Sequence, residues 1–169
     1  MDFKESIKNI FHGYSYKKYW HCRDELFNPK SSRLKKLYCR MYLSKVNRMF
    51  NAYIGYDLKN GNNFKGHPTL GHDLNGIIIA GNAQIGENCY ISHQVTIGRS
   101  RGEVPVIGDN VYIGPGAKIF GGIHIGNNVR IGANCVVFED IPDNSTVVLQ
   151  KPRIIIKDSN YQYSIFNKK

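Results

Sequence analysis

The sequence lacks several features that would place a protein in a broad class at once. Its four cysteines, Cys22, Cys39, Cys89 and Cys135, form no CxxC pair and no zinc-ligand spacing, which argues against a disulfide framework or a zinc ribbon. The longest apolar run, residues 77–80, falls far short of the roughly 20 residues that span a bilayer. The first residues lack the basic and apolar segments of a signal peptide, so we expect a reduced, cytoplasmic protein.

Acidic residues are also scarce, since 13 Asp and Glu stand against 23 Lys and Arg in 169 residues, a net charge of +10. Residues 1–60 hold 13 basic and 5 acidic residues, residues 61–143 hold 5 and 7, and residues 144–169 hold 5 and 1. The two ends therefore carry the charge, whereas the centre is nearly neutral. The centre also has no basic groove with interleaved aromatic residues, so we expect no nucleic-acid partner.

What the centre does contain is a repeat. An aliphatic residue recurs every six positions, with one step of ten, and a small or aliphatic residue often follows it by four positions. The recurring aliphatic residues are Ile79, Ile85, Ile91, Ile97, Ile107, Ile113, Ile119, Ile125, Ile131 and Val137. A period of six fits neither an isolated helix nor an ordinary sandwich. It predicts a prism of stacked coils with short strands on its flat sides, aliphatic residues inside and glycines at tight corners.

This repeat, clearest in the segment Ile107-Gly-Asp-Asn-Val-Tyr-Ile-Gly-Pro-Gly-Ala-Lys-Ile, resembles the hexapeptide-repeat acyltransferases. The resemblance covers about residues 55–155 and is nearest to serine acetyltransferases and capsule or lipopolysaccharide O-acetyltransferases. It implies a mainly β protein, built as a left-handed parallel β-helix. It also implies acetyl-CoA as the acetyl donor, no metal, and a homotrimer with active sites between subunits.

The flanks complete a three-part organisation. We expect a helical N-terminal cap at residues 1–55, with helical spacing of apolar residues near Phe3 and a second helix capped by Ser31 or Ser32. The catalytic β-helix would span residues 56–150, with a loop insertion near 99–106, and a basic tail would occupy residues 151–169. The predicted apolar face of the second helix comprises Leu34, Leu37, Tyr38, Met41, Tyr42, Val46, Met49 and Phe50. Its basic residues are either solvated or contact anionic lipid or a lipid-linked glycan. In the tail, residues 154–156 are expected to form a short strand.

Acetyl transfer to a hydroxyl needs a general base, and histidine has a suitable reference pKa of about 6.5. Of the six histidines, His67, His72 and His93 are the candidates. The segment Leu70-Gly-His-Asp-Leu-Asn-Gly-Ile77 resembles the stretch around the catalytic histidine of the family, which implies that His72 is the base. Asp57 precedes His72 by the interval of the family's Asp–His pair, so the resemblance makes Asp57 the residue that orients the imidazole.

Further site residues have weaker support. His93 and Asn75 are predicted to contact the acceptor, although His93 is equally compatible with an outward surface position. Arg99 and Arg101, in the inserted loop, would bind an acidic sugar or a phosphate of CoA, or else are solvated. By resemblance to the family, CoA would lie along the prism edge against the small residues Gly98, Ala117 and Ala133. Lys151 and Arg153 in the tail would then meet its nucleotide phosphates.

The acceptor is predicted to be a saccharide hydroxyl, of the kind found in capsule or lipopolysaccharide. Serine acetyltransferases carry an acidic residue directly before the catalytic histidine, where this chain has Gly71, and the inserted loop lacks their histidine. Losing such a charged contact to the serine ammonium would cost about 1.5–3 kcal/mol. Serine O-acetyl transfer is the first alternative. A zinc site of the carbonic-anhydrase type using His67, His72 and His93, and a non-catalytic β-helix, are alternatives of another class.

Overall fold

The computed structural model describes residues 13–59, 63–157 and 159, so the predicted helical spacing near Phe3 lies outside the described residues. Two helices come first, α2 (Tyr16–Phe27) and α3 (Arg33–Met49). Their N-caps are Ser15 and Ser32, whose hydroxyls accept hydrogen bonds from the backbone N–H of the third residue of each helix. Of the two predicted caps of the second helix, Ser31 and Ser32, the structure has Ser32.

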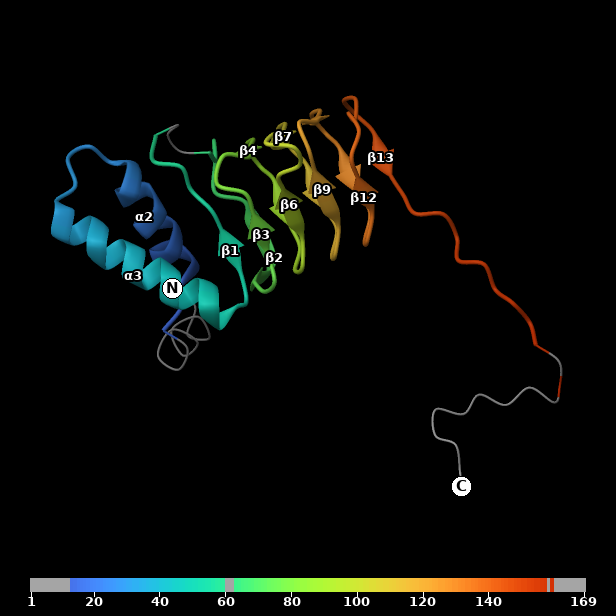
Figure 1. The fold of residues 1–169 in the computed structure, drawn as a ribbon, viewed down its shortest axis with the longest axis horizontal. Helices are drawn as coiled ribbons and strands as arrows, with labels where there is room; N and C mark the ends of the chain where they lie inside the picture. The colour runs from blue at the N-terminus through green and yellow to red at the C-terminus, as the bar shows by residue number, and fades with distance from the viewer. Residues whose placement is uncertain (1–12, 60–62, 158, 160–169) are drawn as a thin grey trace, which may run out of the picture.

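After α3 the described chain forms thirteen short strands. They are β1 (Tyr53–Ile54), β2 (Thr69–Leu74), β3 (Ile78–Ile79), β4 (Gln84–Ile85), β5 (Tyr90–Ile91), β6 (Thr96–Gly98), β7 (Val106–Ile107), β8 (Tyr112–Ile113), β9 (Lys118–Phe120), β10 (His124–Ile125), β11 (Arg130–Ile131), β12 (Val136–Val137) and β13 (Thr146–Val147). Figure 1 shows them stacked side by side, with the two helices at one end and the extended C-terminal segment leaving the other.

The strands make the three faces of a prism. Face 1 has the order β1-β3-β6-β9-β12, face 2 the order β4-β7-β10, and face 3 the order β2-β5-β8-β11-β13. All pairings between these strands are parallel, and the chain visits face 1, face 2 and face 3 in turn before it returns to face 1. The prediction of a parallel β-helix preceded by helices is therefore confirmed.

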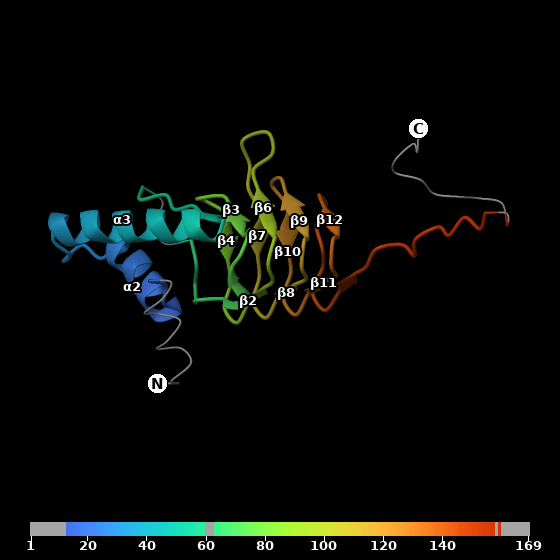
Figure 2. The same cartoon turned by 90° about the horizontal axis from the view of Figure 1, so that it is seen from below.

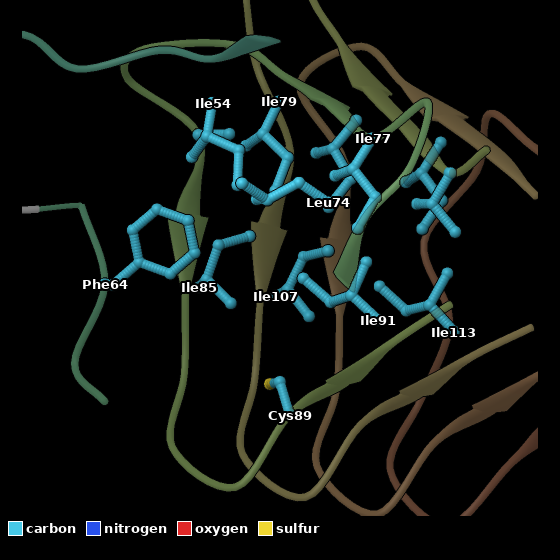
Figure 3. Close-up of a cluster of buried hydrophobic side chains, with 14 of the residues drawn as sticks. Ile54, Phe64, Leu74, Ile77, Ile79, Ile85, Cys89, Ile91, Ile107 and Ile113 are labelled. Atoms are coloured by element: carbon cyan, nitrogen blue, oxygen red, sulfur yellow. The ribbon is translucent and has the colours of Figure 1, made fainter. Parts of the chain in front are cut away.

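The interior holds the residues that the six-residue period selects. The ten recurring aliphatic side chains are all at most 2% exposed, and Figure 3 shows several of them converging on the axis of the prism. Cys89 and Cys135 occupy the small inward position that follows four residues later, and both are buried. Each coil fills only its own layer, so stability depends on the contact between successive layers.

The corner between face 2 and face 3 is built by asparagines. Asn88, Asn110, Asn128 and Asn144 all have positive φ, between 52° and 58°, a conformation that asparagine tolerates better than most residues. Their side-chain amides form a ladder, in which each Nδ2 donates to the Oδ1 of the asparagine in the next coil at 3.1–3.2 Å. The ladder fixes the register of the coils along this corner.

A buried arginine fastens α2 to the first coil. The guanidinium of Arg23 donates to the carbonyl oxygens of Ile54 and Gly55, at 2.7 and 3.0 Å, and to Oδ1 of Asn63 at 3.0 Å. Asn63 in turn donates to the carbonyl of Ala83 in the next coil, at 2.8 Å. Burial lowers the pKa of Arg23, which is only 1% exposed, and the ring of Trp20 packs edge-on against Phe64 beside it.

The apolar face predicted for the second helix is partly wrong. Among its predicted members only Tyr42 and Val46 are buried, together with Cys39 and Leu43, which pack toward α2. The other side of α3 is exposed and still carries large apolar side chains: Leu34, Leu37, Tyr38, Met41 and Met49. Apolar residues are spread around much of α3, so the packing against α2, not the pattern, decides which side is buried.

The strand predicted at residues 154–156 is absent. The chain after β13 runs away from the prism without regular structure (Figure 1), and the three isoleucines are 60–91% exposed. No strand of the described residues pairs with this segment, so its apolar character alone does not make it a strand.

Candidate active site

His72 and His93 meet at one corner of the prism, between face 3 and face 1, which we call the histidine edge. In the parallel pair of β2 and β5, Thr69 lies opposite Tyr90 and Leu70 opposite Ile91. The same register carries on two residues to place His72 beside His93, and their ring centroids are 4.8 Å apart with the planes at 82°. The spacing of 21 residues between His72 and His93, about one coil, thus brings the two rings together through the parallel register.

The backbone turns sharply at the histidine edge. Asp73 and Gln94, the residues that follow the two histidines, both have positive φ, 51° and 58°. This turn leaves His72 exposed, whereas His93 is half-buried and its Nδ1 is enclosed without a hydrogen-bond partner among the described residues. One imidazole thus faces solvent, and a second stands against it with an unused ring nitrogen.

The turn also joins the site to the N-terminal part of the chain. The pKa of the Tyr14 hydroxyl is raised above its usual value, first by burial and then by the negative charge of nearby Asp73. The N–H of Gly76 donates to the carbonyl of Phe50, which follows α3. Asn75 belongs to the same turn, where its carbonyl accepts from Gln94 at 2.8 Å and its side chain is exposed. The helices therefore support the turn that carries His72.

Tyr90 explains the glycine that precedes His72. A Cβ atom at Gly71 would overlap the Tyr90 hydroxyl, so no larger residue fits without displacing that ring. Tyr90 stacks on Tyr112, with ring centroids 5.1 Å apart, and the Arg130 guanidinium lies over Tyr112. Tyr90 is a neighbour of the site that no motif singles out, although its spacing of 21 residues from Thr69 is the same as that between the two histidines.

The remaining predicted residues divide between two edges of face 1. Ala133 lies on the histidine edge, because the register of β5, β8 and β11 aligns it with His93. Gly98 ends β6 at the opposite corner, between face 1 and face 2, where residues 99–105 protrude (Figure 2). We call this corner the loop edge. Arg99 donates there to Oδ1 of Asn82 at 3.0 Å, and Arg101 is exposed in the loop.

Asp57 is also on the loop edge and not beside His72. It follows β1 of face 1 by three residues, and its Oδ1 accepts from the backbone N–H of Lys59 at 2.9 Å. β1 pairs with β3, which places Asp57 in line with Asn82 and away from the turn after β2. Within one copy of the chain, the predicted Asp–His pair is therefore not assembled.

One of the predicted cofactor contacts, Ala117, needs revision. The side chain of Ala117 is fully buried inside the prism, so it has no access to a ligand on the outer surface. Ala117 holds the inward position four residues after Ile113, a position that the six-residue period itself identifies. Lys151 and Arg153 are exposed on the segment that leaves the prism after β13 (Figure 1).

The three histidines required for the zinc alternative do not form one cluster, because His67 is engaged elsewhere. His67 stacks on Trp20, with ring centroids 4.9 Å apart, and its Nε2 contacts the Asp24 carboxylate. Among the described residues, no group of three or more His, Cys, Asp or Glu side chains is placed to hold a metal ion. His124, by contrast, is exposed on face 2, as its place in the repeat predicts.

Residues 105–139 match the family described as bacterial transferase hexapeptide (six repeats). A serine acetyltransferase of Staphylococcus aureus is 37% identical over 128 residues, which cover 73% of this chain and 58% of that protein. One of Helicobacter pylori is 41% identical over 87 residues, covering 49% of this chain and 51% of that protein. The chain thus spans about half the length of the curated relatives it matches.

Solved structures give the same answer. The crystal structure of Neisseria gonorrhoeae serine acetyltransferase in complex with serine superposes with a TM-score of 0.55 at 36% identity. The match covers 70% of this chain and 48% of that one. The prediction of a saccharide acceptor is therefore wrong, because the relatives and structures that match are serine acetyltransferases. That prediction rested on the absence of an acidic side chain at Gly71, a single position that does not outweigh these similarities.

Together, the repeat, the three-faced prism and these similarities lead to one conclusion. The chain contains a hexapeptide-repeat β-helix of the bacterial transferase type, similar in sequence and structure to serine acetyltransferases.

Proposed function

We propose that the chain is an O-acetyltransferase that moves an acetyl group from acetyl-CoA to the hydroxyl of serine. The observation that carries the proposal is the exposed imidazole of His72, standing against His93 on an edge of the prism. Its support from outside the chain is the 37% identity with a serine acetyltransferase over 128 residues.

The reaction follows from the chemistry of an imidazole beside a hydroxyl. His72 takes the proton of the acceptor hydroxyl as its oxygen attacks the thioester carbonyl. The tetrahedral intermediate collapses with cleavage of the C–S bond. His72 returns its proton to the departing sulfur, so CoA leaves as the thiol. A backbone N–H at the edge of the prism stabilises the oxyanion. His93 contacts the acceptor, as does Asn75 in the same turn.

The proposal includes a trimer whose copies meet through face 1. Face 1 and its edges expose several large apolar side chains, a common property of subunit contacts. They are Tyr53, Ile78, Val136 and Phe138, each 44–66% exposed. Cyclic association of copies around face 1 would bring the histidine edge of one copy to the loop edge of the next. The site would then join His72 of one copy to Asp57 of its neighbour.

The donor would lie in the groove between two such edges. Gly98 on the loop edge and Ala133 on the histidine edge leave room for the pantetheine arm. Arg99 and Arg101 in the loop would contact phosphates of CoA, and Lys151 and Arg153 in the tail would contact the same phosphates. Charge-assisted contacts of this kind suit the anionic end of CoA.

The proposal is tested by release of CoA thiol from acetyl-CoA by the purified full chain. We expect release that depends on L-serine and forms O-acetylserine, identified by mass spectrometry. L-Alanine, which has the same backbone and no hydroxyl, is the matched control and should give only background release. Equal release with serine and alanine, or no release with either, would contradict the proposed function.

A further inference from the structure

Helix α3 presents a row of apolar side chains to solvent. Leu34, Leu37 and Met41 are 80%, 54% and 66% exposed, and we call these three residues the α3 stripe. They lie within one third of the helix circumference, because residues three and four apart share a face. The opposite side of α3 packs on α2 through Cys39, Leu43 and Val46. The packing of α2 on α3 therefore leaves the α3 stripe exposed to solvent.

Positive charge surrounds the stripe. The 17 residues of α3 contain six Arg and Lys residues and no Asp or Glu. At 100° per residue, Arg33 and Arg40 fall on one side of the stripe and Lys45 on the other, while Arg48 falls within it. Lys35 points elsewhere, because its Nζ pairs with the Glu25 carboxylate at 2.8 Å. A shallow groove lined by residues 40, 41, 44, 45, 48 and 49 runs along this side.

We propose that the α3 stripe and its flanking cations dock on the surface of an anionic lipid bilayer. A helix with an apolar row bordered by Arg and Lys lies in the plane of the interface, with the apolar row among the acyl chains and the cations at the headgroups. Among the described residues, no helix is long and apolar enough to cross a membrane.

The charge of α3 favours an anionic lipid bilayer over a second copy of the chain as the partner of the α3 stripe. Two α3 helices packed stripe to stripe would bring Arg33, Arg40, Lys45 and Arg48 of both copies together, with no acidic residue on either helix to neutralise them. An anionic surface instead gains from each cation. The tail segment 151–157 also combines basic and apolar residues, but it has no regular structure that would place them on one face.

Vesicle sedimentation of the full chain tests the proposal. We expect binding to vesicles of phosphatidylcholine with about 30% phosphatidylglycerol, little binding to phosphatidylcholine alone, and release in about 0.5 M NaCl. Arg33→Gln, Arg40→Gln and Arg48→Gln together should weaken partitioning on the order of 100-fold. The triple variant Leu34→Ser, Leu37→Ser and Met41→Ser should lose at least tenfold, because the replaced side chains no longer enter the acyl layer.

The tail supplies the matched controls. Ile154→Ser, Ile155→Ser and Ile156→Ser change three apolar residues at least as exposed as the stripe on average, and Lys151→Gln, Arg153→Gln and Lys157→Gln remove three cations. Both control variants should bind the anionic vesicles as the parent does. The proposal fails if the parent does not bind, or if the tail variants lose binding while the α3 variants keep it. It also fails if the stripe variant has a lower molecular mass by sedimentation equilibrium, since a second copy would then cover the stripe. None of these readouts depends on acetyl transfer.

Discussion

Replacing His72 with alanine is expected to lower kcat for serine acetylation by about 1,000-fold, the range that general-base removal produces. In the proposed mechanism, the imidazole of His72 alone takes the proton of the acceptor hydroxyl. A deprotonated hydroxyl attacks a thioester far more readily than a neutral one. Steady-state CoA release at saturating L-serine and acetyl-CoA measures the effect.

The control for this prediction is His124→Ala. His124 is also an exposed histidine in a strand of the prism, but it lies on face 2 and not on the histidine edge. We expect His124→Ala to retain the parental kcat. Near-parental kcat in His72→Ala, with unchanged circular dichroism, would remove His72 from the role of base.

Replacing Arg23 with methionine is expected to lower the free energy of unfolding by on the order of 3 kcal/mol. Methionine fills much of the same volume but leaves the carbonyls of Ile54 and Gly55 and Oδ1 of Asn63 without the donor that each now has. Buried acceptors that lose a partner incur their full desolvation cost. Urea unfolding followed by tryptophan fluorescence measures the change, since Trp20 lies beside the Arg23 guanidinium.

Arg33→Met serves as the comparison for Arg23→Met. Arg33 is exposed at the start of α3, and the same substitution there should change the free energy of unfolding by less than about 0.5 kcal/mol. If Arg23→Met were as stable as Arg33→Met, the hydrogen bonds of Arg23 would not be what fastens α2 to the first coil.

Much of the fold is predictable because the repeat and the structure have the same period. The aliphatic residue at every sixth position points inward, and the offset of four identifies the second inward position, including Cys89 and Cys135. The buried side of α3 is not predictable in the same way. Apolar residues surround most of that helix, and contact with α2 selects Cys39 and Leu43 over Leu34 and Leu37.

The site was predictable only where residues share an edge. Spacing by about one coil brought His72 to His93, because parallel register preserves that interval. The pairing of Asp57 with His72 came from an interval in relatives, and intervals do not reveal which corner of the prism a residue occupies. The acceptor was misassigned because a single position, Gly71, was weighed above the similarity of the rest of the repeat to serine acetyltransferases.

The most direct test of the account mixes two inactive variants. His72→Ala and Asp57→Ala are produced with different affinity tags, and only trimers that carry both tags are purified. In a cyclic trimer with sites shared between neighbours, every such trimer holds one site in which both residues are intact, so roughly one third of the parental rate should return. Serine-dependent CoA release at that level is the predicted result. No recovery beyond the two separate variants would contradict a site built from His72 of one copy and Asp57 of the next.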